Sequence, residues 1–167
     1  MLEYPLLLVF PIAMVFAGAF DLLTMTIPNR ISLTLVVAFA LVAALSGLPI
    51  AAIGMHVAAS AMVLAVGFFL FVRGWLGGGD AKLLAASALW LGFDSLSLFL
   101  LMVGLLGGVL SGLILAFRVY VPGRFLSGPH WLLRLHDKSN GIPYGLAIAS
   151  AALLIYPDTH WFAVLIG

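Results

Sequence analysis

The sequence predicts an all-α membrane protein with six transmembrane helices and both termini on the non-cytoplasmic side. Three observations lead to this fold class. Of the 167 residues, 65% are hydrophobic and only 8% are charged, whereas soluble domains usually carry about a quarter charged residues. The mean hydropathy is +1.27. Short polar connections separate apolar segments, several of which approach the roughly 20 residues that a span needs. We expect one transmembrane domain over residues 1–167 and no separate soluble domain.

Six apolar segments supply the expected spans. The first ends at Asp21, and the turn Ser46–Pro49 separates the second from the third. The fourth has about 13 residues, or about 20 Å of helix, so we expect it to thin the membrane or to have one end inside the boundary. The polar connection Arg118–Asn140 precedes the sixth. In chain order the spans are Leu2 to Phe20, Ile31 to Leu45, Ile50 to Val72, Ala81 to Phe93, Leu96 to Phe117 and Ile142 to Tyr156.

Two further patterns concern the membrane boundary. The stretch Trp131–Leu135 favours a short amphipathic helix on the cytoplasmic surface, where anionic lipid is a possible contact. The tryptophans fit anchoring at the lipid interface; they are Trp75, Trp90, Trp131 and Trp161. His56, inside the third span, is interpreted as a hydrogen-bonded residue between helices rather than a metal ligand.

Composition also excludes several classes of function. The formal net charge of +1 gives no reason to expect a nucleic-acid partner, and the absence of cysteine excludes disulfides, thiolate zinc sites and a thiol nucleophile. The four histidines are too dispersed to form a plausible metal set, so we expect neither a metal nor a cofactor. The first apolar segment lacks the basic region of a cleaved signal peptide, and we expect it to remain as an anchor.

The basic residues set the orientation. With six spans, every lysine and arginine falls on one side, which the positive-inside rule assigns to the cytoplasm. The opposite side carries the acids Glu3, Asp94 and Asp158. Both termini then face outward. The basic residues are Arg30, Arg73, Lys82, Arg118, Arg124, Arg134 and Lys138.

This topology brings two distant acids to one face. Asp21 ends the first span and Asp80 begins the fourth, so both are expected at the cytoplasmic boundary. Two carboxylates that approach closely share a proton; the ionised member can activate water while the protonated member hydrogen-bonds a scissile carbonyl. Alternatively, both are helix-edge acids, and Asp80 caps its helix with a contribution of about 0.5–2 kcal/mol. Spacing and topology leave both interpretations open.

Three motifs resemble the type IV prepilin peptidases, which are membrane aspartyl proteases. The segment Gly77–Leu83, Gly-Gly-Gly-Asp-Ala-Lys-Leu, is similar to their Gly-x-Gly-Asp signature. Asp21 followed by Ile27–Asn29, Ile-Pro-Asn, is similar to their other catalytic segment. Gly141–Gly145, Gly-Ile-Pro-Tyr-Gly, resembles the motif that opens their last core helix. The three motifs occur in order and cover nearly the whole chain.

The resemblance implies a function and a location. Asp21 and Asp80 would be the catalytic pair of an aspartic endopeptidase that removes a short basic leader from prepilins or pseudopilins, at the cytoplasmic face of the bacterial plasma membrane. Larger members also N-methylate the new terminus with an additional cytoplasmic domain. Here the connection from Asp21 to Arg30 is short and cysteine is absent, so we predict peptidase activity alone, as in the compact enzymes of tight-adherence (Flp-type) pilus systems. The oligomeric state stays open.

Residues beside the aspartates are candidates for substrate binding or active-site support. Gly77 and Gly79 either relieve crowding at a turn or open the backbone around Asp80, the interpretation we favour. Lys82 either anchors at the boundary with its charge in water or moderates the negative charge of the pair. The two interpretations of Lys82 stay open.

The proline-containing motifs contribute three more candidates. Pro28 suits the first turn of the second helix, where its missing N–H costs nothing. Asn29 either hydrogen-bonds the region of the first aspartate or forms a turn, and Pro143 shapes the start of the sixth helix. The segment Leu22–Thr26 is uncharged here but often basic in the family, which leaves the charge preference for substrate open.

Other functions compete with this reading. Preflagellin peptidases and presenilin-like proteases share the Gly-x-Gly-Asp chemistry, although the latter lack support from Ile27–Asn29. A small transporter or pilus-assembly scaffold could use Asp21 and Asp80 to bind a proton or cation, since acids within membranes often mark such pathways. The sequence shows no inverted repeat and no ionisable chain to the opposite face, which weighs against transport.

Overall fold

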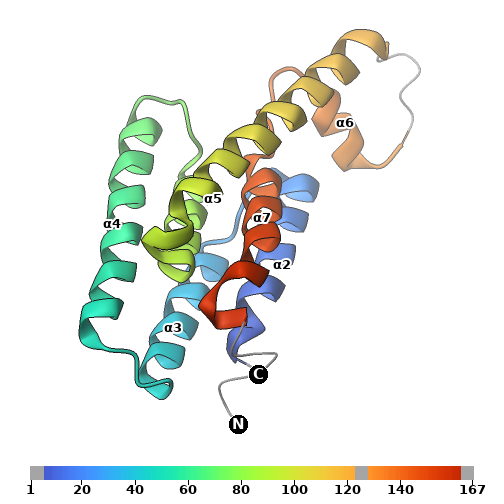
Figure 1. Ribbon diagram of the computed structural model, residues 1–167. Coiled ribbons are helices and arrows are strands. Elements are labelled where there is room, and N and C mark those ends of the chain that lie inside the picture. Colours follow the sequence, from blue (N-terminus) through green and yellow to red (C-terminus); the bar gives the residue numbers. More distant parts are fainter. Residues whose placement is uncertain (1–5, 123–127, 163–167) are drawn as a thin grey trace.

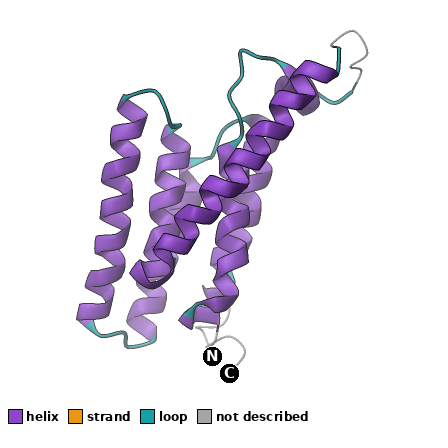
Figure 2. Ribbon diagram, turned by 45° about the horizontal axis from the view of Figure 1, so that its top comes forward, coloured by secondary structure: helices purple, strands orange, loops and turns teal. Residues whose placement is uncertain are grey.

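The computed structural model describes residues 6–122 and 128–162 and contains helices but no strand within these ranges (Figures 1 and 2). The all-α prediction is therefore confirmed for the described residues. The expected start of the first span at residues 2–5, together with Glu3 and Arg124, lies outside them. The elements are α2 (Val9–Thr24), α3 (Asn29–Leu45), α4 (Ile50–Val72), α5 (Gly78–Tyr120), α6 (His130–His136), α7 (Tyr144–Ile155) and the 3₁₀ turn η2 (Tyr156–Asp158).

Helix α5 reverses direction at Gly92, where the backbone has φ +64° and ψ −176°. A straight helix of 43 residues would extend about 65 Å, yet Asp80 near its start and Arg118 near its end line the same cavity. The element is therefore two arms, 78–91 and 93–120, and the second arm runs obliquely across the bundle (Figure 2). The segments expected as the fourth and fifth spans form these two helical arms, with one glycine and no loop between them.

Side chains from other elements stabilise this reversal. A break in a helix leaves carbonyls without their usual N–H partners, and two of these accept side-chain hydrogen bonds. His56 Nδ1 donates to Leu89 O at 2.8 Å, and Trp161 Nε1 donates to Trp90 O at 2.7 Å. A Cβ added at Gly92 would lie 2.9 Å from the His56 ring, so glycine is required there. The prediction that His56 is a hydrogen-bonded residue between helices is confirmed.

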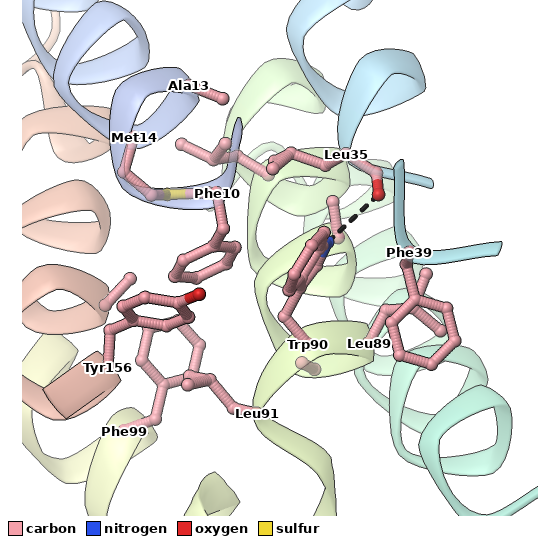
Figure 3. Packing of buried hydrophobic residues seen from close by; sticks show 14 of the residues in the cluster. Phe10, Ala13, Met14, Leu35, Phe39, Leu89, Trp90, Leu91, Phe99 and Tyr156 are labelled. Carbon is pink, nitrogen blue, oxygen red and sulfur yellow. Dashed lines mark hydrogen bonds between the residues drawn. The ribbon is translucent and has the colours of Figure 1, made fainter. Parts of the chain in front are cut away.

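The core is densest at the end of the bundle near this reversal (Figure 3). Phe10 packs against Trp90 and Tyr156 with ring centroids 5.3 and 4.9 Å away. Figure 3 also shows Trp90 Nε1 donating to Leu35 O, at 2.9 Å. Trp90 is fully buried and Trp161 is 3% exposed. Interfacial anchoring was therefore the wrong prediction for these two tryptophans, because their indole N–H groups bond to carbonyls inside the protein.

The apolar surface of the bundle is extensive. Two helices, α4 and α5, are long and apolar enough by length and composition to cross a membrane. Three further apolar helical stretches are shorter: Val9–Thr24, Asn29–Leu45 and Tyr144–Asp158. Large apolar side chains such as Phe68 on α4 and Leu113 on α5 are more than 60% exposed. An outer surface of this kind is suited to contact with lipid.

The two ends of the bundle differ in which acids they carry. Tyr156 Oη donates to Leu7 O at 2.9 Å, so the beginning and the end of the described chain lie together. Asp94 and Asp158 line one cavity at that end. Asp21 and Asp80 line another cavity at the opposite end of the helices. The predicted separation of the two acid pairs is confirmed for the described residues.

Candidate active site

An open cavity of about 730 Å³ lies where α2 ends, α5 begins and α7 begins. Its wall combines polar and apolar side chains from segments that are far apart in the sequence. Both predicted aspartates belong to it. The lining residues are Asp21, Met25, Leu70, Gly74, Trp75, Leu76, Gly77, Asp80, Arg118, Asn140, Gly141, Ile142 and Tyr144.

Asp21 is held by the N-terminus of α7. The carboxyl group lies in the last turn of α2 and is only 5% exposed. Its Oδ2 atom accepts the backbone N–H of Gly145 at 2.6 Å. The first N–H groups of a helix have no partner within the helix and favour negative charge. Asp21 therefore caps a helix that lies 124 residues away in sequence.

Glycine at position 145 is needed for this contact. A Cβ added there would lie 2.8 Å from Asp21 Oδ2 and 2.6 Å from Ile27 Cδ1. Any larger residue would push the N–H away from the carboxylate. Gly145 belongs to a motif that we recognised in the sequence, but its direct contact with Asp21 was not predicted, because the pairing joins the two ends of the chain.

Asp80 lies in the first turn of α5, and Gly77 is the N-cap of that helix. The carboxyl group turns back toward the helix start, because a Cβ at Gly77 would come within 2.7 Å of Asp80 Oδ2. Asp80 is half-buried and interacts electrostatically with Asp21. Asp80 thus lies at the start of its own helix and faces the cavity that contains Asp21.

Ile27 connects the three motifs. A Cβ added at Gly79 would lie 3.2 Å from Ile27 Cβ, so glycine allows α5 to approach the segment that follows α2. The far end of the same side chain lies against Gly145. The lack of side chains at Gly79 and Gly145 thus lets one isoleucine pack between the helices that carry or hold the aspartates.

The remaining predicted residues lie beside the cavity rather than in it. Lys82 Nζ donates to Asn29 Oδ1 at 2.9 Å, joining the starts of α5 and α3. Pro28 is the N-cap of α3 rather than a residue of its first turn. Pro28 and Asn29 line a separate apolar groove of about 770 Å³ between α2 and α3. Pro143 is fully buried at the N-cap of α7. Gly77 is the supporting residue that shares the cavity with both aspartates.

Arg118 and Tyr144 are among the cavity residues that were not predicted. Tyr144 packs against Gly107 of α5, where an added Cβ would lie 2.6 Å from its ring. Arg118 stands in a cluster of basic residues, so the sequence offers no signal that separates it from boundary cations. Within residues 6–122 and 128–162, histidine, aspartate and glutamate form no group of three suited to a metal ion.

Comparison with known proteins identifies the family. The model of the type IV leader peptidase family matches residues 8–112, more than half of the chain. The chain belongs to the type IV leader peptidase family. This confirms the resemblance drawn from the motifs. The match to the leader peptidase family includes Asp21, Ile27 and Asp80, and it ends before Arg118 and Gly145.

Curated relatives show the same likeness over part of their length. The chain is similar to the prepilin leader peptidase/N-methyltransferases of Aeromonas salmonicida and Aeromonas hydrophila, with 38% identity over 92 residues. That region is 52% of this leader peptidase family member and 26% of each relative. The match thus spans about a quarter of their length. No solved structure matches the chain.

Proposed function

We propose that the chain is a membrane aspartyl endopeptidase that removes the short basic leader from type IV (Flp-type) prepilins or pseudopilins. The observation that carries this proposal is the shared cavity of Asp21 and Asp80, which come from helices far apart in the sequence. Membership of the leader peptidase family supports it. The cavity is open and lined by backbone as well as side chains, so an extended peptide can reach both carboxyl groups.

The proposed mechanism gives the two aspartates different roles. Backbone N–H groups favour the ionised form of the carboxylate that accepts them. Asp21 accepts the N–H of Gly145 at the start of α7, so we assign it the role of the base that takes a proton from water. Asp80 then holds the shared proton and donates a hydrogen bond to the scissile carbonyl. Water adds to the carbonyl carbon, the C–N bond breaks, and the departing amine takes up the proton that Asp21 accepted from the water.

Residues beside the cavity are proposed to fix the distance between the carboxyl groups. The hydrogen bond from Lys82 to Asn29 and the packing of Ile27 on Gly79 both join the Asp80 helix to the segment after Asp21. These contacts support a positioning role for Lys82 and Asn29 rather than direct contact with substrate. Catalysis is sensitive to such distances, because a displacement of about 1 Å can cost about a hundredfold in rate.

The proposed topology has six spans in the bacterial plasma membrane. Division of α5 at Gly92 gives two arms and hence six long helical segments. The described basic residues lie toward the end with the aspartates, which the positive-inside rule assigns to the cytoplasm. The substrate helix then reaches the cavity laterally from the bilayer, and its leader lies on the cytoplasmic side.

We further propose that the chain cleaves without N-methylating. Only four residues, 25–28, separate α2 from α3. The Aeromonas relatives, which are named as both peptidases and methyltransferases, are longer than the region they share with this chain. The short connection leaves no room for a cytoplasmic domain at that place. Residues 1–167 would then act as one transmembrane peptidase domain with no cofactor.

Incubation of membranes containing the chain with an Flp-type prepilin tests the function. We expect a smaller product on a gel, with a free and unmethylated amino terminus by mass spectrometry even when S-adenosylmethionine is supplied. Intact prepilin together with pH-dependent ion flux in vesicles would contradict the peptidase and support the transporter. A methylated product would contradict peptidase activity alone.

A further inference from the structure

Arg118 joins the end of α5 to the connection between α6 and α7. Its Nε atom donates to Leu135 O at 2.7 Å, and its Nη2 atom donates to Asn140 O at 3.0 Å and Gly141 O at 3.1 Å. The three carbonyls belong to two places in the connection, the last turn of α6 and the segment just before α7. The planar guanidinium group suits this task, because its donors are fixed in direction.

Neighbouring contacts support the same junction. His136 Nε2 donates to Val121 O at 2.7 Å, and its ring packs edge-on against Phe117. Asp137 follows α6 directly. The backbone N–H of Ser139 lowers the pKa of Asp137, and the positive charge of Arg118 lowers it further. In Figure 1, α6 lies beside the end of α5, at one end of the bundle.

Only a few backbone residues separate the carbonyl groups that Arg118 binds from the N–H group that binds the Asp21 carboxylate. Gly141, whose carbonyl Arg118 binds, is four residues before Gly145, whose N–H binds Asp21. Between them Pro143 is fully buried and fixes the start of α7. The second arm of α5 also meets this segment at Gly107, which packs against Tyr144. The arm therefore contacts this part of the chain at two points, Arg118 and Gly107.

We propose that Arg118 is a positioning residue: by binding the carbonyls of the α6–α7 connection it fixes the start of α7 and thereby the orientation of Asp21. This inference deepens the proposed peptidase function and rests on it. Arg118 acts through the backbone in this account. Loss of its hydrogen bonds should slow the chemical step and leave the binding of substrate unchanged.

Steady-state cleavage of prepilin in detergent tests the catalytic part. For Arg118→Gln we expect kcat to fall about ten- to a hundredfold, a range expected for a displaced catalytic group, and KM to stay within twofold. Arg118→Lys keeps the positive charge but lacks the several fixed N–H donors of the guanidinium group, and we expect a smaller fall in kcat. Arg134→Gln removes an exposed cation from the same connection and should change neither parameter. A rise in KM at unchanged kcat, or an equal effect of Arg134→Gln, would overturn the proposal.

Backbone hydrogen exchange separates this inference from the peptidase function, because it needs no substrate. In Arg118→Gln, amides 144–146 should exchange at least tenfold faster than in the unaltered chain, and in Arg134→Gln they should not. Unchanged exchange at these amides in Arg118→Gln would overturn the positioning role. If the unaltered chain cleaves no prepilin while Arg118→Gln speeds this exchange, the peptidase proposal fails and the structural link from Arg118 to α7 stands.

Discussion

The two ends of the helical bundle are built in opposite ways. At the end near Gly92, aromatic rings fill the interior and their polar atoms bond to carbonyls, as Trp90 does to Leu35 and Tyr156 to Leu7. At the other end the interior is hollow, and two carboxyl groups face the cavity. The closed end supplies close side-chain packing and internal hydrogen bonds, which hold helices together in a bilayer. The open end keeps ionisable groups accessible to water and to a peptide.

Glycine has a different task at each end. Gly92 allows the positive φ that reverses α5 and leaves room for His56. Gly77 and Gly145 lie against the carboxyl groups of Asp80 and Asp21, where any side chain would intrude. At Gly92, glycine determines the path of the backbone. At Gly77 and Gly145, it determines how the two aspartates are positioned. Substitutions at the two ends should therefore affect different measurements.

The largest loss of activity outside the aspartates is expected for Gly145→Ala. The added methyl group would lie 2.8 Å from Asp21 Oδ2, so the N–H must move away from the carboxylate. We expect the rate of prepilin cleavage to fall about a hundredfold or more. Gly141→Ala is the matched control, because a Cβ there meets no atom within 4 Å. Equal rates for the two variants would show that the Gly145 contact is dispensable.

The largest loss of stability is expected for Gly92→Ala. A residue with a side chain is strained at φ +64° and would crowd the His56 ring at 2.9 Å. We expect a loss of about 1–3 kcal/mol in the free energy of unfolding, measured by denaturation in mixed micelles. Gly108→Ala, on an open face of the same helix, should be neutral or stabilising by up to about 1 kcal/mol. A neutral Gly92→Ala would contradict the stated requirement for glycine.

Trp90→Phe tests whether the closed end contributes only stability. The change keeps an aromatic ring but removes the indole N–H that donates to Leu35 O. A hydrogen bond of this kind contributes about 0.5–1.5 kcal/mol, so the unfolding midpoint should fall. At a temperature where the variant is folded, kcat for prepilin cleavage should remain within twofold. A large fall in kcat of the folded variant would show that the closed end also affects catalysis, contrary to this prediction.

The smallest effect is expected at the exposed contact between Lys82 and Asn29. Lys82→Met should lower the cleavage rate about two- to fivefold, the size expected for one exposed hydrogen bond. Asn29→Ala should have a similar effect, and the double variant should be no worse than either single one. Additive losses in that double-mutant cycle would show that the two side chains act separately.

Much of this arrangement could be predicted from the sequence, because its signals are local. Asp21 and Asp80 follow from short motifs and from the distribution of basic residues. The two arms of α5 were predicted as separate spans, but the position of the reversal at Gly92 was not, since a glycine in an apolar run is also compatible with a continuous helix. The burial of Trp161 and the links made by Arg118 depend on carbonyls of distant segments. No short pattern encodes which carbonyl a side chain will reach.

The central claim is that Asp21 and Asp80 act as a pair across one cavity. Prepilin cleavage in membranes by four single variants tests it most directly: Asp21→Asn, Asp80→Asn, Asp94→Asn and Asp158→Asn. Each change removes one negative charge, but the last two acids line the cavity at the opposite end. We expect the first two variants to be inserted and folded yet to lose leader removal entirely, and the last two to cleave within twofold of the unaltered chain. Retained cleavage in Asp21→Asn or in Asp80→Asn would contradict the account.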